Sequence, residues 1–258
     1  MQYKRSLLCR NELMAYRDEK GKPYSADYLR TIHAQLTAIF NHAVNFYNLS
    51  YNPARRAGTI GSEAVKEMDF WTKEEYLKFS EAMMDKPRSY YAFEMLYWCG
   101  MRSGELLALT PADIDFEKQT VTISKTFHRS KGRDIITSPK TKKSNRTIKM
   151  PPFLCEEMQE FFKMQYGLKK KDRIFTINKS YLHREMDRGA EAAGVKRIRI
   201  HDLRHSHISL LIDMGFSAVA IADRVGHESI EITYRYAHLF PSKQKEMASK
   251  LDNLNKGA

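Results

Sequence analysis

The sequence predicts an α+β fold that is mostly helical, with a small helical N-terminal domain and a larger C-terminal domain of helices around a three-stranded antiparallel sheet. Three observations predict it. Apolar residues recur at helical spacing over most of the 258 residues, whereas short β-branched runs are confined to residues 119–151. Residues 57–69 lack apolar periodicity and contain two glycines. We therefore place the domains at residues 1–60 and 70–258, with a linker at 61–69.

The N-terminal domain is expected to contain two helices. A short one over residues 7–18 is followed by a turn at Gly21-Lys22-Pro23, and a long amphipathic one starts after the N-cap Ser25. The apolar face of the long helix comprises Leu29, Ile32, Leu36, Ile39, Phe40, Ala43 and Phe46. A second turn is expected at Asn52-Pro53. The polar face and the segment after it carry Arg30, His33, Arg55 and Arg56, which could contact DNA or could form a solvated surface.

The C-terminal domain is expected to begin with three helices. Thr72 caps the first, over residues 73–84, and Glu75 completes a capping box. The second ends at Gly100, and the third starts near Arg102. The predicted strands are residues 119–127, 133–139 and 145–151. Further helices are expected at residues 152–166, 179–193, 201–214, 217–225, 228–237 and 242–254.

Composition limits the classes of partner. A net charge of +12 and a pI near 9.5 favour polyanions, either nucleic acid or acidic lipid headgroups. No run approaches the roughly 18 apolar residues of a membrane helix, and no signal peptide is evident, so we expect a cytoplasmic protein without membrane contact. The three cysteines, Cys9, Cys99 and Cys155, form no CxxC pair, so no cysteine-based metal site is expected.

A set of polar residues in the C-terminal domain suggests phosphoryl transfer without a metal. Taken singly, each has an ordinary explanation; Arg102, for example, could simply pair with Glu105. Together they supply guanidinium groups that hold a phosphate, imidazole and ammonium groups that move protons, and a phenolic nucleophile. The set comprises Arg102, His201, Arg204, His227, Tyr236 and a lysine among residues 140–143.

Two other assignments compete at these positions. Tyr234 lies two residues before Tyr236, a rotation of roughly 200° on a helix, so both hydroxyls cannot enter one pocket. His201 and His205 have the spacing of a zinc pair, but neither a metalloprotease glutamate nor an evident third ligand accompanies them. We therefore expect no metal and no cofactor.

The order and spacing of these residues resemble the tyrosine recombinases, including integrases of phages and conjugative elements and Xer-type recombinases. The likeness rests on Met101-Arg102-Ser103-Gly104-Glu105, on His201-x-x-Arg204-His205, and on the nine-residue step from His227 to Tyr236. It implies that Arg102 and Arg204 bind the scissile phosphate while His201 and His227 assist proton transfer. Tyr236 would be the nucleophile, and Glu105 would support the site.

The resemblance also implies a lysine general acid in the turn between the second and third predicted strands. Lys140 is the preferred choice, although Lys142 and Lys143 are close to it. The neighbouring basic residues Lys142, Lys143 and Arg146 would otherwise contact DNA phosphates.

The implied function is site-specific DNA recombination through a 3′-phosphotyrosyl intermediate. Implied partners are double-stranded DNA at specific sites, a homotetramer in the synaptic complex formed from free monomers, and an accessory DNA-bending or directionality protein, in the bacterial cytoplasm or nucleoid. An apolar stripe, Met247, Leu251 and Leu254, would dock on a neighbouring protomer or pack on its own domain.

Two alternative functions remain open on the sequence. One is a type IB topoisomerase, and the other is a non-catalytic DNA-binding relic of an integrase. Residues 1–60 resemble a shortened core-binding (SAM-like) domain, which puts full recombination activity in doubt.

Overall fold

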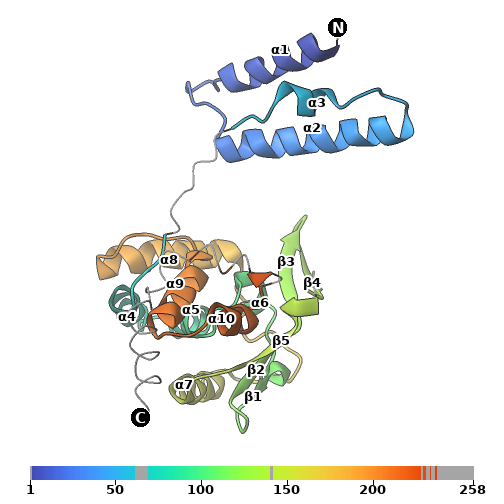
Figure 1. Ribbon diagram of the computed structural model, residues 1–258. Helices are drawn as coiled ribbons and strands as arrows, with labels where there is room; N and C mark the ends of the chain where they lie inside the picture. Colours follow the sequence, from blue (N-terminus) through green and yellow to red (C-terminus); the bar gives the residue numbers. More distant parts are fainter. Residues whose placement is uncertain are drawn as a thin grey trace, which may run out of the picture. The chain divides into compact units, whose positions relative to one another are not determined.

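The computed structural model describes residues 2–61, 69–139 and 142–227, together with residues 229, 230, 233 and 236. The chain forms two compact units, Met1–Glu67 and Met68–Ala258 (Figure 1). The expected helix at 242–254 and most of the expected helix at 228–237 lie outside the described residues. So does Lys140.

The described part of the N-terminal unit contains three helices, α1 (Gln2–Ala15), α2 (Ala26–Phe46) and α3 (Pro53–Ala57) (Figure 1). The Ser25 hydroxyl accepts from the backbone N–H of Tyr28, so the predicted N-cap of α2 is confirmed. The predicted turn at Asn52-Pro53 is instead the start of α3. The Asn52 side chain accepts from the backbone N–H groups of Ala54 and Arg55 at 2.9 and 3.1 Å, and proline suits the first helical position.

The predicted apolar face of α2 is only partly buried. Leu29 is buried, but Ile39 and Phe46 are 61% and 71% exposed. In the described part of this unit, α3 has only five residues and is much shorter than α2. The predicted long helix is confirmed, and its apolar face is buried at Leu29 but largely exposed at Ile39 and Phe46.

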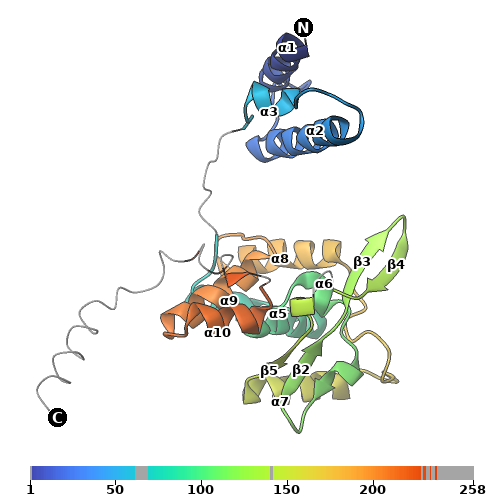
Figure 2. The ribbon, with the colours of Figure 1, turned by 45° about the vertical axis from the view of Figure 1, so that its right-hand side comes forward.

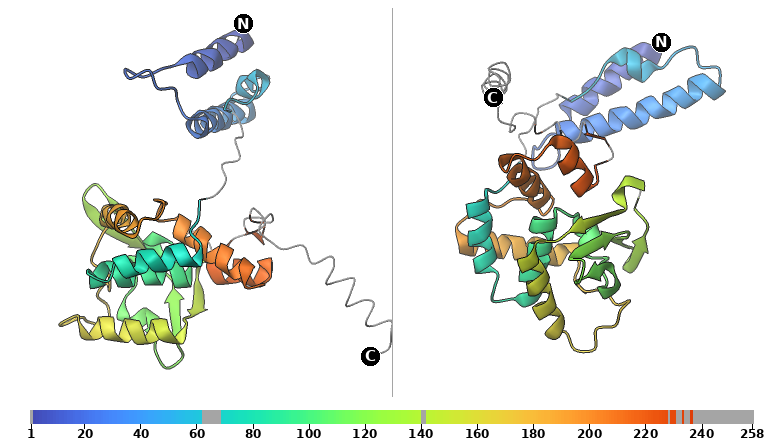
Figure 3. Two further views of the ribbon diagram at one scale, coloured as in Figure 1. Left: turned by 90° about the vertical axis from the view of Figure 1, so that its left-hand side faces the viewer. Right: turned by 60° about the horizontal axis from the view of Figure 1, so that its bottom comes forward.

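The C-terminal unit begins with α4 (Lys73–Ala82), α5 (Pro87–Cys99) and α6 (Ser103–Leu106). The capping box of Thr72 and Glu75 is present, as predicted. Gly100 adopts φ +61°, a left-handed conformation that stops α5. Most side chains of α5 are buried, because this helix contacts α4, α6, α7 (Pro152–Lys163) and α9 (Asp202–Asp213) (Figure 3).

The strands form two sheets in place of the single sheet that was expected. β1 (Ile114–Asp115), β2 (Thr120–Ile123) and β5 (Arg146–Lys149) make an antiparallel sheet in the order β1-β2-β5. Its inner face includes Val121 and Ile148, which lie opposite each other in the register and are both buried. A three-stranded antiparallel sheet is therefore present, but the predicted strand 133–139 is not part of it.

That strand belongs to a separate hairpin, β3 (Thr126–Ser130) with β4 (Arg133–Thr137), which extends away from the helices (Figure 2). The predicted strand 119–127 is thus divided between the two sheets. At the break, the Lys125 ammonium lies 2.6 Å from the Asp113 carboxylate. The two-residue turn Lys131-Gly132 has φ +48° and +77°, which suits the twist of a tight hairpin.

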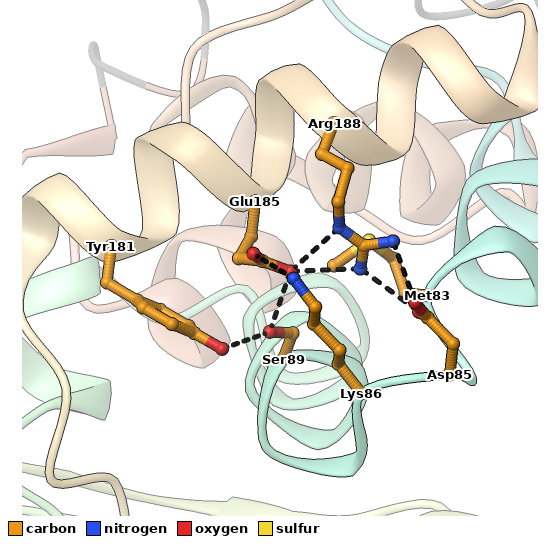
Figure 4. Close-up of polar contacts among 7 residues, drawn as sticks. All are labelled: Met83, Asp85, Lys86, Ser89, Tyr181, Glu185 and Arg188. Atoms are coloured by element: carbon orange, nitrogen blue, oxygen red, sulfur yellow. Dashed lines mark hydrogen bonds and ion pairs between the residues drawn. The ribbon is translucent and has the colours of Figure 1, made fainter.

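The remaining helices are α8 (Lys179–Ala193), α9 and α10 (Ala218–Val225). A polar cluster fastens α8 to the turn between α4 and α5 (Figure 4). The Glu185 carboxylate is buried and accepts from Lys86, Ser89 and Arg188. Arg188 also bonds both carboxylate oxygens of Asp85 at 3.1 Å.

No helix in the described part of the chain is long and apolar enough to cross a membrane.

Candidate active site

The first arginine of the site is held by the end of one helix and the start of the next. Gly100 ends α5, and Arg102 immediately precedes α6. The Glu105 carboxylate accepts from the backbone N–H of Arg102 at 2.9 Å and from its guanidinium at 2.8 Å. The Arg102 side chain is still 39% exposed, so part of its guanidinium remains accessible to a ligand.

A second arginine, Arg146 on β5, shares the same buried carboxylate. Its Nη1 and Nη2 donate to the two Glu105 oxygens at 3.1 and 2.9 Å. Burial acts to raise the pKa of Glu105, but hydrogen bonds and charge from Arg146 and then Arg102 bring the pKa below its ordinary value. Glu105 is therefore ionised at neutral pH. Sequence analysis assigned Arg146 to DNA contact and missed this pairing.

The third arginine, Arg204, lies in the first turn of α9 and is 2% exposed. Its Nη1 donates to the carbonyl oxygen of Gly100 at 2.9 Å, and its buried Nη2 has no hydrogen-bond partner among the described residues. Desolvation, followed by the charges of Arg102 and Arg146, lowers the pKa of Arg204 to about 9. A bound anion would supply both the missing acceptor and a compensating charge.

Two histidines at this site are held in the neutral form. His227 is buried behind the C-terminus of α10, and its Nδ1 is 2.8 Å from the Thr233 hydroxyl. Desolvation and the charges of Arg204 and Arg102 lower its pKa to about 3. At the start of α9, His201 is exposed, and its pKa is lowered by partial desolvation and by the same two arginines. A neutral imidazole keeps one N–H, which it can donate to a phosphate oxygen.

Tyr236 lies beside this group in a small apolar cluster. It belongs to a buried cluster with four aliphatic side chains, and only 2% of the residue is exposed. The cluster comprises Ile208, Ile212, Ile221 and Val225. The tyrosine hydroxyl forms a hydrogen bond with Nδ1 of His205. In the sequence His205 was noted only for its zinc-pair spacing with His201 and as the last residue of the His201-x-x-Arg204-His205 motif, and neither signal pointed to a contact with Tyr236.

The lysines are only partly described. Lys140 and Thr141 lie outside the described residues, as does the side chain of Lys142. Lys143 lines a hollow of about 360 Å³ together with Arg146, Gly226 and His227. Lys143, the last of the three candidate lysines, therefore lies beside Arg146 and His227.

The N-terminal residues expected to bind DNA are not gathered at one place. Arg30 forms an ion pair within α2, and His33 lines an apolar hollow of about 230 Å³. Arg55 and Arg56 are exposed on α3 and line a different hollow of about 540 Å³. The Arg56 guanidinium lies 5.2 Å from the ring centroid of Tyr51, in cation–π geometry.

The expected absence of a zinc site concerns His201 and His205, whose rings lie 5.0 Å apart and edge to face. Among the described residues there is no group of three histidine, cysteine, aspartate or glutamate side chains that could hold a metal ion. The nearest acidic partner of His205 is Asp202, whose carboxylate lies 3.8 Å from Nε2. Asp202 also accepts from Arg199.

Three sequence relatives are informative. Residues 69–243 match the model of the phage integrase family. The chain is 32% identical to ICEBs1 integrase of Bacillus subtilis over 244 residues, which cover 88% of this chain and 65% of that protein. It is 29% identical to the integrase of Staphylococcus phage L54a, with 94% and 78% covered. It is 28% identical to the putative prophage phiRv2 integrase of Mycobacterium tuberculosis, with 85% and 60% covered. The chain thus spans less than two thirds of the first and third relatives.

Solved structures with the same fold include two in complex with DNA. The Tn1549 transposon integrase, solved with transposon right end DNA, matches with a TM-score of 0.77 and 18% identity over 99% of this chain and 86% of that one. The XerH site-specific recombinase, in a post-cleavage complex with palindromic difH substrate, matches with a TM-score of 0.70 and 20% identity over 96% and 72%. At these identities the likeness establishes the fold.

Proposed function

This chain belongs to the phage integrase family, and from that premise we propose that it is a site-specific DNA recombinase that acts through a 3′-phosphotyrosyl intermediate on Tyr236. The observation that carries the proposal is the pair of arginines. Arg204 is buried with an unsatisfied Nη2 among the described residues, and the charge of Arg102 acts on it at close range. Such a pair suits a phosphodiester whose non-bridging oxygens gain charge during attack.

In the proposed reaction, the Tyr236 Oη attacks the scissile phosphorus and the bond from phosphorus to the 5′ oxygen breaks. The tyrosine proton leaves to a base at the site, and the departing 5′ oxygen takes a proton from a lysine. Arg102 and Arg204 hold the non-bridging oxygens, and the neutral histidines His201 and His227 hydrogen-bond the phosphate. The 5′ hydroxyl of a partner strand then attacks the phosphotyrosine and releases the enzyme. Because the phosphodiester is exchanged for a phosphotyrosyl ester of similar energy, the cycle needs no ATP.

The buried hydrogen bond between Tyr236 and His205 bears on the first step. A hydroxyl held at the His205 nitrogen and enclosed by aliphatic side chains cannot attack an incoming phosphate. We infer that Tyr236 leaves this position when DNA binds and turns toward the phosphate-binding arginines.

The test is covalent capture on a nicked suicide duplex in the presence of EDTA. The duplex carries the recombination site of the mobile DNA element that encodes the protein. Cleavage next to the nick releases a short oligonucleotide, so the adduct accumulates and migrates slowly on a denaturing gel. We expect Tyr236→Phe to form no adduct, whereas the matched control Tyr234→Phe forms it. An adduct that persists in Tyr236→Phe would falsify the assignment of the nucleophile. Relaxation of supercoiled DNA of arbitrary sequence would favour a type IB topoisomerase, and salt-sensitive binding without an adduct would indicate a relic.

The general acid is assigned by a leaving-group experiment. We propose Lys140, with Lys142 and Lys143 as matched comparisons. A duplex with sulfur in place of the bridging 5′ oxygen has a leaving group that needs no proton, so it restores cleavage only to the variant that lacks the acid. We expect this rescue for Lys140→Ala and not for the other two alanine variants. Rescue of a different variant would move the assignment to that lysine.

Assembly is proposed to use an apolar groove on the C-terminal unit. The groove has a volume of about 390 Å³ and includes Phe153, Met214 and Phe216, which are 41%, 62% and 47% exposed. We propose that it receives the C-terminal stripe of a neighbouring copy in a synaptic tetramer. Truncation after Leu239 and the groove substitution Met214→Glu should both abolish pairing of two DNA sites while leaving binding to one site intact. Unchanged synapsis in either variant would contradict the docking.

A further inference from the structure

Arg146 is an arginine whose guanidinium makes four hydrogen bonds. Its side chain is 7% exposed, and Nη1 and Nη2 hold both oxygens of Glu105. Its Nε donates to the carbonyl oxygen of Arg224 at 3.1 Å, and Nη1 also reaches the carbonyl of Ser144 at 3.2 Å. One guanidinium therefore joins the start of α6, the segment after the candidate lysines, and the last turn of α10.

These contacts bear on three parts of the site. The Arg224 carbonyl is in the last turn of α10, where carbonyls lack intrahelical partners and the helix dipole is negative, so a cation is favoured there. His227 follows two residues after that helix. Ser144 is the last residue of the short helical turn Lys142–Ser144, which carries two of the three candidate lysines. Glu105 is the residue that holds Arg102.

We propose that Arg146 is a positioning residue for this reaction. It saturates the buried Glu105 carboxylate so that part of the Arg102 guanidinium remains available to phosphate, and it fixes Ser144 and the end of α10 before His227 relative to that arginine. The inference rests on the proposed function, because it names how the phosphate-binding arginine is held.

The distribution of charge explains why a second arginine is needed. Glu105 is a single buried anion with two oxygens, and a buried carboxylate needs several donors to remain ionised. With Arg146 present, Arg102 contributes one guanidinium nitrogen and its backbone N–H to Glu105. Without Arg146, the carboxylate would draw more of the Arg102 guanidinium toward itself or would take up a proton. Either change displaces Arg102 from the position in which it meets the substrate.

A direct contact between Arg146 and DNA, as the sequence suggested, would have a different consequence. Such a contact would require breaking several of the four hydrogen bonds described above. The backbone of Gly226 also encloses the side chain. A Cβ at Gly226 would lie 2.9 Å from Cδ of Arg146 and 3.1 Å from its Nη1. The absence of a side chain at position 226 thus makes room for the buried guanidinium.

The experiment compares Arg146→Met, Arg146→Lys, Glu105→Gln and the double variant Glu105→Gln with Arg146→Met, each in the full-length chain. The readouts are the single-turnover rate of adduct formation at saturating suicide duplex, its pH profile, and the Kd for DNA as a function of salt. Arg188→Met is the matched control. It removes an arginine that likewise bonds a buried glutamate, but in the polar cluster between α8 and the α4–α5 turn (Figure 4).

We expect Arg146→Met to lower the adduct rate by about 100-fold, the loss typical of a misplacement of about 1 Å at a reacting centre. The acid limb of the pH profile of the adduct rate should move to higher pH in this variant, because Glu105 keeps its charge less readily without Arg146. In the double variant the acid limb of the pH profile should not be shifted, because Glu105 has been replaced by glutamine. The adduct rate of the double variant should be no lower than that of the slower single variant. Arg146→Lys should recover part of the rate, since one ammonium replaces the charge without the fork. Arg188→Met should lower thermal stability and leave the adduct rate unchanged at a temperature where it is folded.

Three results would overturn the inference. A normal adduct rate in Arg146→Met would show that the site does not depend on this residue. An unchanged rate at saturation with a weaker Kd and a salt slope smaller by about 1 would make Arg146 a phosphate contact. Multiplicative losses in the double variant would mean that Arg146 does not act through Glu105. If the wild-type chain itself forms no adduct, the proposed function fails instead, and the two failures are distinguishable.

Discussion

His207 makes the stability of the C-terminal unit depend on pH. It is 2% exposed on α9, and its Nε2 accepts a hydrogen bond from Nε of Arg224 at 3.1 Å, which requires the neutral imidazole. Desolvation, followed by the charges of Arg224 and Arg204, lowers its pKa from 6.5 to about 3. Below pH 6.5 the unfolded chain therefore takes up a proton that the folded protein refuses. The stability contributed by this residue is fully present above pH 6.5 and is lost as the pH falls toward 3.

The size of this effect follows from the two pKa values. Between pH 7 and pH 5 the unfolded form gains about 2 kcal/mol from protonation of one such histidine, while the folded form gains almost nothing. His207→Gln keeps an acceptor for Arg224 but does not titrate. We expect it to lower the free energy of unfolding at pH 7 through lost packing, and we expect the difference from wild type to shrink by about 2 kcal/mol at pH 5.

The assay is urea unfolding followed by tryptophan fluorescence. Both tryptophans of the chain, Trp71 and Trp98, lie in the C-terminal unit, so the signal reports on that unit alone. Ser209→Ala is a suitable control, because it alters a buried side chain of the same helix and should lower stability equally at every pH. If the His207→Gln and wild-type curves run parallel between pH 7 and pH 5, the reasoning is refuted.

Three further substitutions probe the core and the phosphate pocket. Glu94→Leu should lower the free energy of unfolding in urea by at least about 3 kcal/mol, because it leaves the buried donors of Tyr76 and Ser80 and the partly buried donor of Trp98 unpaired. A loss below about 1 kcal/mol would contradict this. Gly100→Ala should lower stability by about 2 kcal/mol or more, since its φ is +61° and the new Cβ would overlap the His207 ring. Wild-type melting behaviour would argue against that overlap. Arg204→Lys should lower the adduct rate by at least about 100-fold, because one ammonium cannot bond both the Gly100 carbonyl and the phosphate in fork geometry; a rate near wild type would mean that the fork is unnecessary.

Local signals in the sequence were sufficient for most helices. Caps such as Ser25 and Thr72 bond to backbone groups within one helical turn. The residues that predict such a cap are therefore the same residues that form it. The α3 helix was missed because Asn-Pro is typical of a turn and of a helix start alike. The hairpin of β3 and β4 had a usable signal in Lys131-Gly132, but β-branched runs alone do not tell which strands pair.

The site was only partly accessible to sequence reasoning. Motif spacing selected Arg102, Arg204 and His227 as candidates, and the structure places both arginines close enough for their charges to lower the pKa of His227. The partnership of Glu105 with Arg146 joins residues 41 positions apart, and no local pattern encodes it. The hydrogen bond of Tyr236 to His205 likewise depends on how the chain after α10 packs, which spacing does not determine.

The backbone at Gly226 has a consequence for genetics. This residue combines a left-handed φ of +68° with close approach to Arg146, so every other amino acid is both strained and obstructed there. If the chain is a recombinase as proposed, a random mutagenesis screen for loss of recombination should therefore recover Gly226 as often as Arg102 and Arg204, the two arginines proposed to bind phosphate. The positions that tolerate no substitution would then include Gly226 and Arg146. The screen would thus detect residues that hold the proposed catalytic groups in place as well as those groups themselves.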